Sequence, residues 1–109
     1  MNSIPAIAAR SKAARPLSLH TLYLATRDGA PFSRAERGVV ATAVAARFPG
    51  FRLSDTLGSF GGRPVATLLV DVAADDTPRV MALARDLGLA LGQGKVGLAV
   101  GGQYQNISA

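Results

Sequence analysis

The order of its apolar runs is the feature that most constrains what this chain can fold into. Runs with strand-like and helix-like periodicity alternate as β-α-β-β-α-β, at Leu22–Ala25, Val39–Phe48, Phe51–Leu57, Val65–Val72, Val80–Leu91 and Val96–Val100. Two such halves side by side bury one face of a sheet under two helices and leave the other face uncovered. The sequence therefore predicts an α+β fold with a four-stranded antiparallel sheet and two helices on one face.

Composition divides the chain into three parts. Residues 1–18 contain no acidic residue and are expected to form a flexible basic arm, with the cations Arg10, Lys12 and Arg15. A solvated tail and an organellar transit peptide are the alternatives for this arm. Residues 19–102 are expected to form the folded domain, and residues 103–109 a polar C-terminal tail.

Short motifs predict where the helices and one hairpin begin. Ser33 and Glu36 form a capping box, in which each side chain bonds to the backbone amide of the other. Thr77, directly before a proline, is the expected N-cap of the second helix. Gly61 and Gly62 supply the positive φ angles of a tight turn, so an antiparallel hairpin is expected there.

Strand alternation sorts the side chains between the two faces of the predicted sheet. Leu57 and Leu68 belong with the apolar residues under the helices. Asp55 would join them in a regular strand, which predicts a β-bulge or a strand end at Asp55. The uncovered face is polar and centred on Tyr23, and it also holds Arg52, Ser54, Thr56, Thr67, Leu69, Gly97 and Ala99. Its small residues leave room for another backbone or a flat ligand.

Composition also narrows the classes of function. A net charge of +5 and a pI near 10.8, with arginine in excess of lysine, favour an acidic partner; surplus surface charge for solubility is the alternative. The absence of cysteine excludes disulfides and thiolate chemistry, and a single histidine excludes a multi-histidine metal site. We expect no catalytic residue, no metal, no cofactor and no membrane segment, in a cytoplasmic protein.

Two further features of the sequence, a histidine and a tract in the first strand, bear on function. His20, at the edge of the first strand, is expected to be exposed or to cap a backbone group rather than to act in catalysis. The tract Leu22–Thr26 is similar to the first-strand motif of RNA-recognition domains, in which an aromatic side chain stacks on a base. The partner tract Arg63–Val70 contains no aromatic residue, which disfavours RNA recognition of that kind.

A series of motifs in the chain resembles a family of small bacterial proteins of unknown function. In that family a first strand, a D-G turn, an S-x-A-E helix start and an R-F-P-x-G-F/W-T segment precede a hairpin. The matching residues here are Leu22-Tyr23-Leu24, Asp28-Gly29, Ser33-Arg34-Ala35-Glu36, Arg47-Phe48-Pro49-Gly50-Phe51, Asp55 and Gly58. The similarity covers about residues 22–100 and implies a ferredoxin-like βαββαβ domain, without implying a substrate. The short glycine hairpin and the basic arm depart from the family.

These observations favour a non-enzymatic interaction module that binds an acidic partner. That partner is a nucleic acid or a nucleic-acid-handling protein complex, as for a small regulator or inhibitor carried by a mobile element. The expected partner-binding residues are Arg10, Lys12, Arg15, Tyr23, Arg52 and Thr67. The alternative is a small-molecule-binding or cofactor-free enzymatic domain that uses the uncovered face, through which it also forms a homodimer. A pocket over Tyr23 would favour the ligand alternative, and a flat basic face would favour the macromolecular partner.

Overall fold

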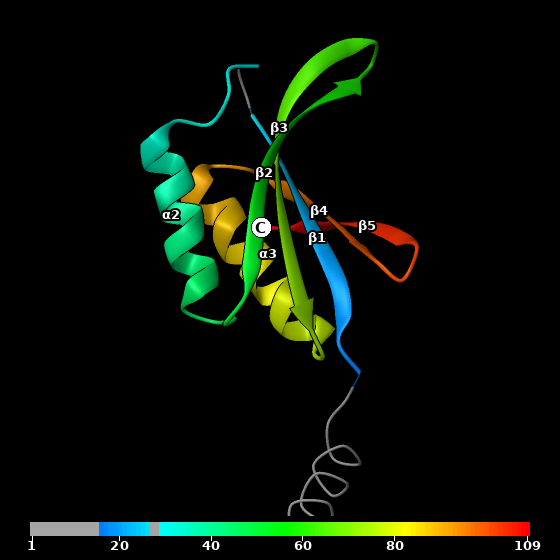
Figure 1. Ribbon diagram of the computed structural model, residues 1–109. Coiled ribbons are helices and arrows are strands. Elements are labelled where there is room, and N and C mark those ends of the chain that lie inside the picture. Colours follow the sequence, from blue (N-terminus) through cyan, green and yellow to red (C-terminus); the bar gives the residue numbers. More distant parts are fainter. Residues whose placement is uncertain (1–15, 27–28) are drawn as a thin grey trace, which may run out of the picture.

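The computed structural model describes residues 16–26 and 29–109, with the side chain of Phe60 left out (Figure 1). Arg10, Lys12 and Arg15 lie outside the described residues, so the expectations for them remain predictions. The elements in chain order are β1 (Ser18–Ala25), α2 (Arg34–Ala45), β2 (Phe51–Phe60), β3 (Arg63–Ala74), α3 (Thr77–Leu91), β4 (Lys95–Val100) and β5 (Gln103–Ser108).

The strands form one antiparallel sheet in the order β2-β3-β1-β4-β5, and α2 and α3 lie on one side of it (Figure 1). The fold is α+β, but the prediction of a four-stranded ferredoxin-like sheet is wrong, because the described chain has five strands. The fifth is the segment that we expected to be a polar tail, residues 103–109. Strand β5 pairs with β4 along its whole length, from Lys95↔Ser108 to Val100↔Gln103.

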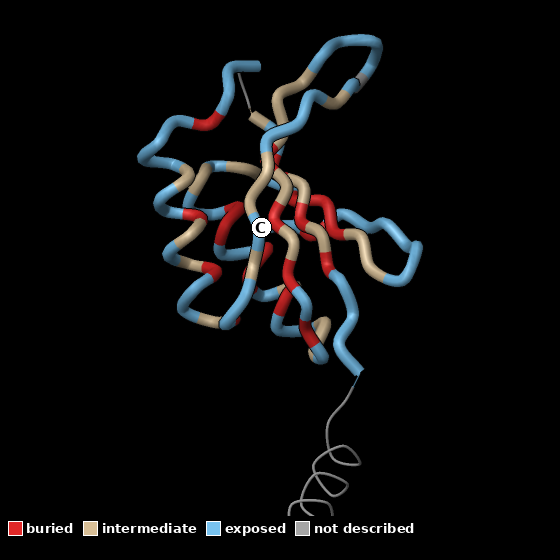
Figure 2. The backbone as a smooth tube through the Cα atoms, in the orientation of Figure 1, coloured by how far each residue is buried: buried red, intermediate tan, exposed pale blue. Residues whose placement is uncertain are grey.

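The core lies between the helices and the covered face of the sheet, and Figure 2 shows the buried residues along the middle of the sheet and the inner sides of the helices. Apolar alternation predicted this face correctly for most of the sheet. The fully buried strand residues are Leu22, Leu24, Leu68, Val70, Val72, Val96 and Leu98. Leu57 is an exception to the expectation: it is 72% exposed, because β2 and β3 there continue past the end of β1.

Helix α2 begins as predicted, with the Ser33 hydroxyl accepting from the Glu36 amide at 3.1 Å and the Glu36 carboxylate accepting from the Ser33 amide at 2.8 Å. Helix α3 begins differently. Its N-cap is Asp76, whose carboxylate accepts from the amide of Arg79, so the prediction of Thr77 as the cap is wrong. Aspartate is an equally good cap, and the neighbouring threonine is thereby left to bond elsewhere.

His20 is buried, at 1% exposure, so the expected exposed position at the strand edge is wrong. Its Nδ1 lies 2.9 Å from the carbonyl oxygen of Ser18, which can only accept, so Nδ1 carries the hydrogen. Its Nε2 lies 2.9 Å from the Thr77 hydroxyl, which donates to it when the ring is neutral. The ring thus ties β1 to the first residue of α3, and both ring nitrogens are satisfied in the neutral form.

Two hairpins are closed by the same glycine turn. Gly61 and Gly62 have φ angles of 59° and 76°, and Gly101 and Gly102 repeat these values between β4 and β5. Positive φ at both central positions is the requirement of a type I′ turn, which matches the twist of the paired strands.

The bulge predicted at Asp55 is absent from the β2–β3 pairing, which is regular from Phe51↔Val72 to Phe60↔Arg63. The Asp55 carboxylate does face the helices, where it forms an ion pair with Arg37 of α2. This pairing removes the conflict that led us to expect a bulge, because the carboxylate has a cationic partner and stays 59% exposed.

Candidate functional site

The face of the sheet opposite the helices carries the candidate site. Tyr23 of β1 lies at its middle, opposite Leu69 of β3 on one side and Gly97 of β4 on the other. Since β5 extends the sheet beyond β4, this face also includes side chains of the C-terminal strand, with Tyr104 opposite Ala99 and Asn106 opposite Gly97. The uncovered face is therefore wider, and richer in aromatic residues, than the sequence predicted.

Tyr104 lies directly over Gly97. A Cβ atom added to Gly97 would lie only 2.2 Å from the Tyr104 hydroxyl oxygen and 2.7 Å from its Cζ, so no larger residue fits beneath the ring in this position. The Tyr104 ring meets the Tyr23 ring edge-to-face, with centroids 5.5 Å apart and planes at 67°. The room that we expected a second backbone or flat ligand to fill at Gly97 is taken by an aromatic ring of the same chain.

A hollow of about 320 Å³ opens beside this aromatic pair, and we call it the open-face cradle. The β2–β3 hairpin forms one wall, the β4–β5 hairpin forms the other, and β1 lies between them. Its lining consists of Tyr23, Ala25, Gly58, Ser59, Val65, Thr67, Lys95, Gly97, Tyr104 and Asn106. Its volume is at the low end of the range of small-ligand pockets, about 300–1,000 Å³.

The described lining of the cradle combines aromatic side chains with neutral polar groups and the cation of Lys95. Among the lining residues that the structure describes, Lys95 is the one charged side chain, and none is a carboxylate or an imidazole. The hydroxyl of Tyr104 donates to Oδ1 of Asn106 at 3.4 Å, which leaves the amide nitrogen of Asn106 to donate to another group. The Thr67 hydroxyl donates to the Val65 carbonyl at 3.2 Å and retains its lone pairs as acceptors.

The structure brings two of the predicted site residues together and separates a third from them. Tyr23 and Thr67 both line the cradle, whereas Arg52 does not. Arg52 pairs with Asp71, with 2.9 Å between a guanidinium nitrogen and Oδ2, and Asp71 also accepts from Thr21 at 2.7 Å. The charge of Arg52 is thus balanced within the sheet, although 75% of its side chain is exposed.

Sequence reasoning missed several residues of the cradle, among them Lys95, Tyr104 and Asn106. The last two lie in the segment that we expected to be a tail. The signal that would have found them is the Gly101-Gly102 pair, which repeats the Gly61-Gly62 signal between two segments that can pair as strands.

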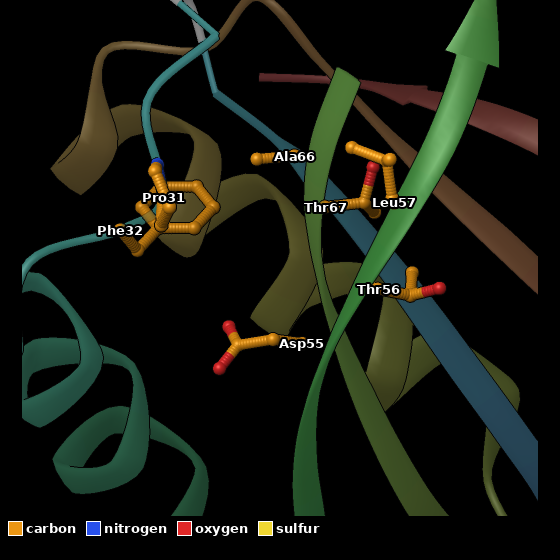
Figure 3. Close-up of a pocket in the computed structure, with 7 residues that line it drawn as sticks. All are labelled: Pro31, Phe32, Asp55, Thr56, Leu57, Ala66 and Thr67. Carbon is orange, nitrogen blue, oxygen red and sulfur yellow. The ribbon is translucent and has the colours of Figure 1, made fainter. Parts of the chain in front are cut away.

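Two other hollows have fewer groups that are available to bind a ligand. Figure 3 shows the first, about 280 Å³, between the loop before α2 and the β2–β3 hairpin; Asp55 points toward α2, and Pro31, Phe32, Leu57 and Ala66 supply most of the remaining surface. Its one carboxylate is engaged by Arg37. The second is a wide depression of about 540 Å³ beside Leu17 and Leu19, where the charged residues are the Arg52–Asp71 pair.

Within residues 16–26 and 29–109, no group of three or more histidine, aspartate or glutamate residues is placed to hold a metal ion. The helices of the same described part are too short and too polar to cross a bilayer. Compared with models of protein families, with curated proteins and with solved structures, the chain shows no significant similarity to any of them.

Proposed function

We propose that this protein is a binding module for an anionic ligand, and that the ligand occupies the open-face cradle. The observation that carries the proposal is a concave site over Tyr23 in which Lys95 is the one charged residue of the described lining. A pocket over Tyr23 is the feature that favours a small ligand over a macromolecular partner bound to a flat face. The ligand is acidic, as the composition of the chain led us to expect, and the cradle is its proposed site.

Charge and shape both support an anion with an apolar body. The described residues that line the cradle with Lys95 include no carboxylate, so none of them offsets its attraction for an incoming anion. The hollow lies between two hairpins, so a ligand within it contacts both walls. The aromatic surface of Tyr23 and Tyr104 provides contact area for the apolar part of the ligand.

The same lining supports binding rather than catalysis. General acid–base chemistry most often uses histidine or a carboxylate with a pKa near the working pH. The part of the cradle that the structure describes is lined by neither, and His20 is held between Ser18 and Thr77 on the opposite side of the sheet from the cradle.

Replacing Lys95 with glutamine will weaken the binding of an anionic ligand by about 10- to 100-fold, the range expected when a hydrogen bond to a charged group is lost. A suitable probe is 2-naphthoate, compared with its neutral analogue 2-naphthamide and measured by calorimetry on the full chain. The naphthamide affinity will change little, because that ligand carries no charge for Lys95 to attract.

Arg85→Gln is the matched control, since Arg85 is an exposed cation on α3, on the other side of the sheet. It changes the net charge by the same amount and will leave both affinities unchanged. Equal naphthoate affinity in the wild-type and Lys95→Gln proteins, or equal losses in the two variants, would show that the anion is not held in the cradle.

A second candidate function is binding of an acidic macromolecule by the N-terminal segment. Arg10, Lys12 and Arg15 supply +3 of the net charge of +5, so most of the charge surplus lies in these first residues. Changing all three to glutamine will weaken binding to polyglutamate by about 3- to 100-fold, if three exposed ion pairs contribute about 0.2–1 kcal/mol each. The salt dependence will also flatten, because fewer charges are neutralised on association.

Unchanged affinity and salt dependence in the triple variant would exclude this segment as the binding element. The homodimer through the uncovered face remains a prediction, and sedimentation of the full chain over a range of concentrations tests it.

A further inference from the structure

We propose that the natural ligand of the open-face cradle is a nucleotide unit, whose base stacks on Tyr104 and whose phosphate is bound by Lys95. This inference rests on the proposed function and names its ligand class. The nucleotide comes either from a free mononucleotide or from a single strand, and the two sources share the same recognition chemistry.

The aromatic pair supplies a stacking surface that is oriented in advance. Tyr104 is a large aromatic residue on an uncovered sheet face, and it stays 60% exposed although Gly97 lies beneath it and the Tyr23 ring beside it. The glycine and the edge-to-face contact restrict the orientation of the Tyr104 ring. Exposed tyrosines held on a sheet in this way are the platforms on which proteins stack unpaired bases.

The polar groups around the pair match the remaining parts of a nucleotide. The Asn106 amide nitrogen is left to donate, while the Thr67 hydroxyl oxygen offers an acceptor, so both kinds of group on a base edge or sugar find partners. Lys95 offers the cation for the phosphate. A hollow of about 320 Å³ suits one small ligand rather than a long stretch of strand.

The sequence had argued against base stacking because β3 carries no aromatic residue beside Tyr23. In the structure the second aromatic residue comes from β5 instead, on the other side of β1, across β4. Two aromatic rings therefore lie side by side on the uncovered face even though β3 carries none.

The test uses a fluorescein-labelled thymidine hexanucleotide, whose anisotropy reports binding to the full chain, with unlabelled thymidine monophosphate as competitor. The chain contains two tyrosines and no tryptophan, and both tyrosines line the cradle, so intrinsic tyrosine fluorescence reports separately on occupancy of this site. We expect the hexanucleotide to bind and to change that fluorescence. Full competition by the monophosphate identifies the free nucleotide as sufficient, and absence of competition identifies the strand as the source.

Tyr104→Leu will weaken the binding by about 5- to 100-fold, as expected for the loss of one stacked base, while Tyr104→Phe will retain most of the affinity. Because Tyr104 is mostly exposed, the leucine variant will fold, which circular dichroism checks. Wild-type affinity in Tyr104→Leu, or no binding of either nucleotide probe, overturns the inference. If nucleotides fail while 2-naphthoate binds in a Lys95-dependent way, only the ligand class is wrong; if no anion binds, the proposed function fails too.

Discussion

Replacing Leu68 with alanine will lower the free energy of unfolding by about 2–5 kcal/mol, the range found for large-to-small changes at fully buried positions. Leu68 has 0% exposure and lies in β3, the strand that connects β2 to β1 in the sheet, directly opposite Leu24. The truncation removes apolar contacts and leaves a cavity that a sheet paired on both sides cannot collapse to fill. Urea denaturation measures the loss, as a lower midpoint with an unchanged slope.

Leu57→Ala provides the matched control for this prediction. Leu57 is also a strand leucine with the same side chain, but it is 72% exposed near the end of the β2–β3 hairpin. Its truncation will change stability by no more than about 0.5 kcal/mol, as is usual for surface positions. If the two variants lost equal stability, the assignment of the two leucines to core and surface would be wrong.

Replacing Ile107 with alanine will also cost about 2–5 kcal/mol. Ile107 is 4% exposed, pairs with Val96 of β4 and belongs to the core cluster, and α3 packs on β5. The end of β5 is held further by the Ala109 amide, which donates to the Gly94 carbonyl at 2.9 Å. The same denaturation experiment measures the effect.

Gln105→Ala is the control in the same strand, because Gln105 is exposed and its side chain is not part of the core. It will change stability by about 0.5 kcal/mol or less. A polar tail would tolerate both substitutions equally, so an Ile107→Ala protein as stable as wild type would contradict the fifth strand.

Local patterns in the sequence determined much of the covered half of the molecule. Apolar residues at the alternate positions Leu68, Val70 and Val72 indicated the core face of β3, because only one face of this sheet is buried against helices. The capping box at Ser33 and Glu36 and the Gly61-Gly62 turn were also predicted correctly. Each of these depends on residues within a few positions of one another, where geometry follows from the residue types alone.

Tertiary contacts decided the features that the sequence left open or predicted wrongly. The burial of His20 depends on the Thr77 hydroxyl 57 positions away, and the regular strand at Asp55 depends on Arg37 of a helix. The segment after Gly102 carries a single strongly apolar residue, Ile107, so its periodicity is too weak to predict a strand. Pairing with β4 supplies the hydrogen bonds that make it one.

Some residues of the candidate site were predictable from the sequence, and others depend on the tertiary structure. Tyr23 and Thr67 were predicted from alternation alone, because the face of a residue in a regular strand follows from its position. Tyr104 and Asn106 join them only because β5 folds back along β4 and brings the Tyr104 ring over Gly97, and Lys95 joins them because β4 pairs with β1. Which side chains meet across strands depends on strand order and register, and these are set by the packing of the whole sheet rather than by any one segment.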